Sequence, residues 1–123
     1  SDTVSFRHAS LLTTELPTAD LVIARDVLFH LSTAHVHTAL ANIRRSNGTL
    51  LLATTFPWLP ENKDLEPNKD PSLPFDSHRM PVWGYREVNL DAAPFFLRGR
   101  GLESVEESWG EDDNDIRATR HLK

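Results

Sequence analysis

The chain has 123 residues, of which 39% are hydrophobic and 25% are charged, a composition typical of one small globular domain. Its formal net charge of -5 argues against a nucleic-acid binder held by phosphate contacts, and the absence of cysteine excludes a disulfide framework, a thiolate zinc site and a cysteine nucleophile. No apolar run approaches the roughly 18 residues that cross a bilayer, and the first residues lack the basic and apolar regions of a signal peptide, so the sequence predicts a cytoplasmic protein.

Two short apolar segments in the first 25 residues predict strands. Residues 4–9 alternate apolar with polar side chains, and this alternation predicts a short half-buried strand. Pro17 lies in the connector that follows and forbids a continuing helix there. Residues 21–24 form a compact apolar run between charged residues, which is typical of a strand buried on both faces of a parallel sheet.

A helix pattern and a further strand pattern come next. Ser32 is a candidate N-cap, and residues 33–45 place apolar side chains at helical spacing, with two arginines in the last turn. Asn47, which is followed by glycine, predicts a left-handed stop. Residues 49–55 predict a second buried strand. A strand, a helix and a strand joined by short links predict a right-handed crossover between parallel strands, so the expected fold class is α/β.

The second half of the chain is organised differently. Six of the eight prolines lie between residues 57 and 81, and we expect residues 57–84 to form one long loop, which inside a small domain is usually functional or mobile. Residues 102–109 predict a strand, residues 110–115 an acidic turn, and residues 116–123 a strand that returns antiparallel. The sequence has no internal repeat, so we expect a single domain over residues 1–123.

Chemically useful side chains follow two of the predicted strands, at the ends where parallel α/β sheets bind ligands. Arg25, Asp26 and His30 lie within six positions after the first buried strand, and Thr54-Thr55-Phe56 follows the second. These residues form the candidate site. The alternative is structural, with Arg25 paired to Asp26 at the strand end and His30 packed beside the helix cap.

Three histidines raise the hypothesis of a metal site, which their spacing disfavours. His30, His35 and His37 are five and two residues apart, whereas ligand pairs on a helix need separations of three or four to face the same way. We therefore expect no metal site.

Residues 16–32, which read LPTADLVIARDVLFHLS, resemble the fourth-strand segment of class I S-adenosylmethionine-dependent methyltransferases. The run RDVLFHLS within them is similar to one uncharacterised subgroup of that family. Residues 48–56 resemble the family's fifth strand. Further along the chain, the residues that resemble the subgroup's downstream pattern are Asn62, Asp64, residues 85–90 (YREVNL) and Pro94-Phe95.

The resemblance implies a Rossmann-like sheet with strand order 3-2-1-4-5-7-6, of which this chain supplies strands 3 to 7, ending in an antiparallel C-terminal hairpin. Residues 4–9 would be the third strand, residues 21–25 the fourth and residues 49–55 the fifth. The family's first two strands and its glycine-rich cofactor loop are not in this sequence. The resemblance therefore implies the C-terminal part of a longer enzyme, and the first residue, which is not methionine, agrees with a truncated domain.

The activity that the resemblance implies is methyl transfer from S-adenosylmethionine to a small-molecule acceptor. The expected partner is a missing N-terminal half or a second copy of the chain, without nucleic acid or a membrane. The alternative, which the missing glycine loop favours, is a non-catalytic Rossmann-like binding or interaction module, or a degenerate half that assembles with another chain. The implied site residues are Asp26 and His30 for catalysis, Ser10, Arg25 and Leu28 for the cofactor, and Thr55, Phe56, Asn62, Arg86 and Asn89 for the substrate.

Overall fold

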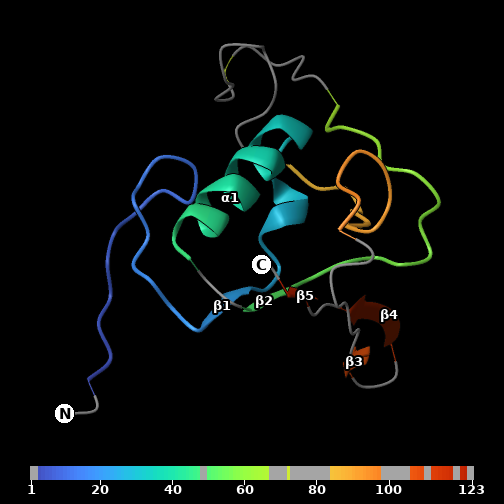
Figure 1. Ribbon diagram of the computed structural model, residues 1–123. Coiled ribbons are helices and arrows are strands. Elements are labelled where there is room, and N and C mark those ends of the chain that lie inside the picture. The colour runs from blue at the N-terminus through green and yellow to red at the C-terminus, as the bar shows by residue number, and fades with distance from the viewer. Residues whose placement is uncertain are drawn as a thin grey trace.

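A computed structural model of the chain describes residues 3–47, 50–66, 72 and 84–97, together with the backbone of strands at 106–109, 112–117 and 120–121. Its centre consists of β1 (Leu21–Ala24), α1 (Thr33–Arg45) and β2 (Leu50–Ala53). The two strands pair in parallel, with Leu21 opposite Leu50 and Ala24 opposite Ala53. The helix connects them and lies over one face of the pair (Figure 1). The described fold is thus a small α/β unit, and the predicted strand–helix–strand order is confirmed.

The helix begins and ends where the sequence predicts, because both ends are specified locally. The Ser32 hydroxyl accepts a hydrogen bond from the His35 amide at 3.2 Å, which satisfies one of the unpaired donors of the first turn. At the other end Asn47 has a φ of 58°, the left-handed conformation that stops a helix. The buried face of the helix carries Val36, Ala39, Leu40 and Ile43, at the spacing of an amphipathic helix.

The two faces of the sheet differ in burial. Ala24 and Leu51 lie on the face that meets the helix and are almost inaccessible to solvent. On the opposite face Leu21 is 47% exposed and Ile23 is 61% exposed. The prediction that residues 21–24 are buried on both faces is therefore wrong for this structure, because only one face of β1 is covered by the helix. The opposite face is apolar and open.

The predicted strand at residues 4–9 is wrong. Residues 3–9 have no regular secondary structure, and their side chains are exposed, including Val4 at 81% and Phe6 at 92%. The segment extends away from the helix and the sheet (Figure 1). An alternating pattern forms a strand only when a neighbouring strand accepts its backbone hydrogen bonds, and in the described part of the chain no strand lies beside it.

The rest of the core comes from two segments that follow the strands. The 3₁₀ helix η1 (Leu28–His30) buries Leu28 and Phe29 directly after β1. An extended segment, residues 84–90, which we call the strap, buries Val88 and Leu90 against the same core. At its start, a Cβ on Gly84 would lie 2.9 Å from Cδ2 of Leu65, so any larger residue there would require the Leu65 side chain to shift. The strap therefore closes the core at the ends of the strands.

Within the residues that the structure describes, three further strands follow: β3 (Glu106–Trp109), β4 (Asp112–Arg117) and β5 (Arg120–His121). β5 pairs antiparallel with β2, and β3 pairs antiparallel with β4 in a separate two-stranded sheet. We expected an acidic turn at residues 110–115 and a strand from residue 116. In the structure the strand β4 already begins at Asp112, so most of the acidic residues of the expected turn lie within β4. The longer methyltransferase order stays a prediction. Most of the expected proline-rich loop, residues 67–71 and 73–83, lies outside the described residues.

Leu51 and Leu52 offer a matched test of this arrangement. Leu51 is fully buried under the helix, whereas Leu52 is only partly buried on the open face. We expect Leu51→Ala to lower the free energy of unfolding by about 2 to 5 kcal/mol, since it leaves a cavity in the core. Leu52→Ala is expected to cost clearly less. Equal losses in urea unfolding would contradict the assignment of the two faces.

Candidate functional site

Asp26 joins the carboxyl ends of the two parallel strands. It follows β1 with a φ of 55°, a left-handed conformation that is uncommon for any residue other than glycine. Its amide donates a hydrogen bond to the Thr54 hydroxyl at 2.8 Å, and that hydroxyl donates to Oδ1 of Asp26 at 3.1 Å. Strained residues of this kind cluster at functional sites, because the surrounding structure must hold them in place.

The carboxylate of Asp26 remains accessible at this position. Arg25 Nε lies 3.9 Å from Asp26 Oδ2, and the two side chains are 44% and 43% exposed. The predicted alternative of an ion pair at the strand end is therefore present, but in this exposed setting it contributes little stability. The pair places one anionic and one cationic group at the edge of the sheet where a ligand of an α/β protein binds.

His30 is anchored by the strap. Its Nδ1 lies 2.7 Å from the carbonyl oxygen of Gly84, and since a carbonyl only accepts, Nδ1 carries the proton. In the neutral ring the lone pair then stands on Nε2, the arrangement that a general base requires. The ring packs on Phe29 at 4.5 Å between centroids and on Tyr85 at 6.1 Å. The structure thus orients this histidine, as a role in binding or proton transfer needs.

A row of five rings, which we call the aromatic surface, lies next to these strand ends. Phe29 contacts Phe56 and Tyr85 edge to face, with centroids 5.6 and 5.3 Å apart, and Phe56 contacts Trp58 at 5.4 Å. His30 completes the row. Phe29 and Phe56 are buried, whereas Trp58 and Tyr85 are 47% and 62% exposed. The buried rings therefore support two rings that face solvent.

Asn62 and Asn89, both predicted to bind substrate, bond to each other. Asn62 Nδ2 donates to the Asn89 carbonyl at 2.8 Å, and the Asn89 amide donates to Asn62 Oδ1 at 2.7 Å. Asn89 Nδ2 donates to the Leu59 carbonyl at 2.8 Å. These bonds fasten the strap to the segment after β2. The polar groups of both asparagines are thus used inside the chain.

Arg86, the third predicted substrate ligand, is likewise turned inward. Its guanidinium donates to the carbonyls of Phe29, Leu31 and Lys63. Burial lowers the pKa of Arg86 from its ordinary value, and the nearby carboxylate of Asp64 opposes that shift. Asp64 in turn accepts the Thr33 amide at 2.9 Å, which adds a second cap to α1. The arginine thus stabilises the loop beneath the strap.

The remaining predicted site residues divide between the core and the surface. Thr55 is fully buried and accepts the Leu90 amide at 2.9 Å, and Phe56 and Leu28 are core residues, 5% and 1% exposed. Ser10 lies in the exposed N-terminal segment, where its hydroxyl accepts the Leu12 amide at 3.2 Å. Of the three residues assigned to the cofactor, only Arg25 combines an exposed side chain with a position at the strand ends.

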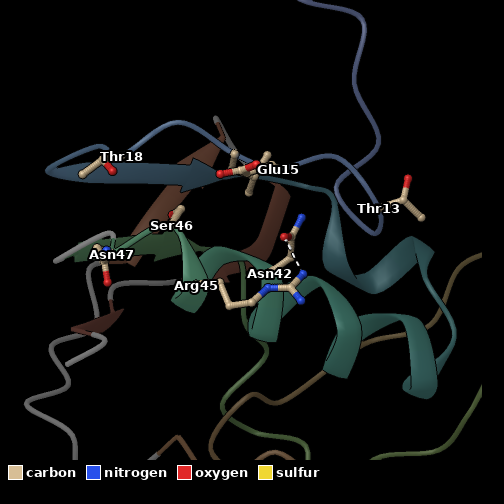
Figure 2. Close-up of a pocket in the computed structure, with 8 residues that line it drawn as sticks. Thr13, Glu15, Thr18, Asn42, Arg45, Ser46 and Asn47 are labelled. Carbon is tan, nitrogen blue, oxygen red and sulfur yellow. Dashed lines mark hydrogen bonds between the residues drawn. The ribbon is translucent and has the colours of Figure 1, made fainter.

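Ser10 adjoins a segment that packs at the far end of α1, near a polar hollow of about 570 Å³ (Figure 2). Asn42 Nδ2 donates to the carbonyls of Leu11 and Thr14, and Arg45 donates to Asn42 Oδ1 at 2.9 Å. These groups satisfy one another and fasten the connector to the helix. The hollow is lined by Thr13, Glu15, Leu16, Thr18, Asn42, Arg45, Ser46 and Asn47. The hollow lies beside Asn42, at the end of α1 that is opposite the strand-end site. We therefore assign the polar hollow no part in that site.

Within the described part of the chain, no group of three or more histidine, cysteine, aspartate or glutamate side chains could hold a metal ion. Over the same residues no helix is long and apolar enough to cross a membrane. Comparisons of the chain with protein-family models, with curated proteins and with solved structures found no match. The geometry of the site therefore carries the functional argument.

Sequence reasoning placed Thr54 at the candidate site, but not its bond to Asp26, which spans 28 positions. It missed two further residues that the structure brings to the site. Trp58 and Glu87 meet through a hydrogen bond of 3.0 Å between the indole Nε1 and Oε2. A local pattern cannot reveal such pairs, since each partner belongs to a different segment. The only available signal was the high aromatic content on both sides of the proline-rich loop.

The left-handed conformation of Asp26 can be tested by substitution. Asp26→Val removes the hydrogen bond from Thr54 and places a β-branched residue at positive φ, so we expect the free energy of unfolding to fall by about 2 to 3 kcal/mol. Asp26→Asn keeps an acceptor and tolerates this conformation, and is expected to change stability by less than about 1 kcal/mol. Urea unfolding measures both variants. Similar stability of the two would argue against the strained backbone.

Proposed function

We propose that this chain is the C-terminal part of an enzyme that transfers a methyl group from S-adenosylmethionine to a small-molecule acceptor. The resemblance of residues 16–32 to a methyltransferase strand suggests the reaction. The observation that carries the proposal is Asp26, held in a strained conformation between the ends of two parallel strands with its carboxylate accessible. This is the edge of the sheet at which α/β enzymes bind ligands.

Methyl transfer demands positioning more than acid–base chemistry, which agrees with a site that has few ionisable groups. S-adenosylmethionine, when bound, supplies an electrophilic methyl group on a positively charged sulfur. The Asp26 carboxylate is suited to take a proton from an amine or hydroxyl acceptor, and the oriented ring of His30 is the second candidate for that role.

The described residues fit only one side of the cofactor. Arg25 and Asp26 present accessible charged groups at the strand ends, whereas Leu28 is buried and Ser10 adjoins the segment at the far end of α1. The ribose and the methionine part of the cofactor therefore need residues from another segment. We assign that segment to the strands and glycine-rich loop that precede strand 4 in the family resembled.

The open side of β1 supports an incomplete sheet. In the part of the chain that the structure describes, β1 pairs on one edge only, with β2. Its uncovered face presents Leu21 and Ile23, both exposed. An apolar edge strand is an aggregation hazard that proteins normally cover. An additional strand beside β1 would remove the free edge, and an element packed on the open face would cover Leu21 and Ile23.

Binding of the cofactor product tests the proposal directly. In the native polypeptide that contains these residues, we expect S-adenosylhomocysteine to bind with a Kd near the micromolar range in calorimetry. Asp26→Asn should leave that binding within a few-fold and lower kcat by about 10²-fold or more, the usual contribution of a general base. The control Asp20→Asn, which changes an exposed carboxylate before β1, should retain activity.

One outcome would overturn the proposed methyl transfer, and a second would overturn the role of Asp26 in it. If S-adenosylhomocysteine does not bind the native polypeptide, the chain is a binding or interaction module, the alternative that the bare face of β1 also favours. If the cofactor binds and Asp26→Asn retains full activity, Asp26 has no role in the reaction.

The exposed Ile23 tests whether another segment covers the sheet. Ile23→Glu should change the stability of the 123-residue chain by less than about 1 kcal/mol, since this side chain is 61% exposed. In a longer polypeptide that packs another element on this face, the same change buries a charge and should cost about 3 kcal/mol or more. Ala41→Glu on the exposed side of α1 is the control. Equal effects in the two polypeptides would count against a covering segment.

A further inference from the structure

The two exposed rings of the aromatic surface lie beside a carboxylate. Trp58 is 47% exposed and Tyr85 is 62% exposed, so both rings are accessible to a ligand. The Trp58 indole donates to Oε2 of Glu87 at 3.0 Å. A carboxylate accepts through several lone pairs, so this bond leaves Glu87 able to accept from a ligand as well.

The extended strap places Tyr85 and Glu87 on the same face. The amides of Gly84 and Arg86, two residues apart, donate to the neighbouring carbonyls of His30 and Phe29, the alternation of a strand. Side chains at positions 85 and 87 of an extended segment point to one side, and Trp58 bonds to Glu87, so Tyr85, Glu87 and Trp58 form one surface. Arg86 lines the hollow beside Glu87, and its guanidinium donates to backbone carbonyls.

These side chains pack against the core in the absence of a ligand. Tyr85 packs edge to face on the buried Phe29, and Trp58 packs in the same way on the buried Phe56. The Phe56 amide donates to the Val88 carbonyl at 2.9 Å, which holds the two segments together. A surface ordered in this way loses little entropy on binding, which favours recognition.

Glu87 also borders a hollow that has room for a ring system. The hollow has a volume of about 450 Å³, within the range of small-molecule sites. Its lining is formed by Leu59, Pro60, Glu61, Lys63, Arg86 and Glu87. A flat ligand that reaches Glu87 can therefore contact apolar groups on that side of the carboxylate.

We propose that this surface, formed by Trp58, Tyr85 and Glu87, binds a flat aromatic amine, and that such amines are the class of methyl acceptor. The rings stack with the ligand and attract its positive charge, and Glu87 accepts a hydrogen bond from its N–H group. The claim that aromatic amines are the methyl acceptor rests on the proposed methyl transfer. The claim that this surface binds a flat aromatic amine rests on the surface alone.

The test uses three probes that separate ring from charge. 4-Aminoquinoline has a flat ring, a positive charge on its protonated ring nitrogen and N–H donors, cyclohexylamine has a cationic amine without an aromatic ring, and naphthalene-2-sulfonate has the ring with a negative charge. Titration of the native polypeptide is followed through the indole N–H signal of Trp58 in ¹H–¹⁵N correlation spectra, assigned with Trp58→Phe. We expect 4-aminoquinoline to bind at least about tenfold more tightly than either other probe.

Matched variants locate the binding. Glu87→Gln and Tyr85→Leu should each weaken 4-aminoquinoline about fivefold to tenfold. The controls are Glu15→Gln, an exposed carboxylate at the far end of α1, and Phe96→Leu, an exposed ring outside the aromatic surface, and neither should change the affinity. All four side chains lie at least partly at the surface, and circular dichroism verifies that the variants fold.

Each outcome has a separate meaning. Equal binding of cyclohexylamine, or an unchanged affinity in Glu87→Gln, overturns the proposed site. If 4-aminoquinoline binds as expected and the polypeptide does not bind S-adenosylhomocysteine, the aromatic-amine site stands and the methyl-transfer function fails. If S-adenosylhomocysteine binds and 4-aminoquinoline does not, the reaction class stands and the aromatic-amine acceptor is wrong.

Discussion

The hydrogen bonds that hold the strap across the strand ends are the interactions on which the rest of the structure depends. Two parallel strands and one helix bury only one face of a sheet, and the core would otherwise open toward the carboxyl ends. The strap fills that place with Val88 and Leu90, because its amides pair with the carbonyls of η1 and its Asn89 pairs with Asn62. The Asn62 side chain bonds to the backbone of Asn89, and the Asn89 side chain donates to the Leu59 carbonyl, so these polar groups keep partners when the core closes.

The same closure builds both parts of the candidate site. It orients His30 through the Gly84 carbonyl, and it supports Tyr85 on the buried Phe29. Asp26 stands at the adjacent strand end in a strained conformation that its two bonds with Thr54 hold in place. A charged strand end thus lies beside the aromatic surface, at the end of the sheet opposite the helix end that the connector covers, and it is there that we propose small-molecule binding.

Prediction from the sequence succeeded where the information was local. The bounds of α1 follow from the Ser32 cap, the helical spacing of apolar residues and the left-handed Asn47, all within a few positions of one another. It failed for residues 4–9, since the alternating pattern carries no information about a partner strand. It also assigned Asn62, Arg86 and Asn89 to a substrate, whereas in the structure their polar groups bond to segments 20 or more positions away.

The sequence by itself determined the α/β order of the central unit and the helix, because periodicity, caps and turn residues act over one or two turns of chain. It also placed Arg25, Asp26 and His30 just after a strand. Only the tertiary structure decided which face of β1 is covered and that Asp26 bonds to Thr54. It also decided that two rings and Glu87 form one surface. Such pairings join distant segments, and their free energy comes from burial and hydrogen bonds that exist only once the strap has closed the core.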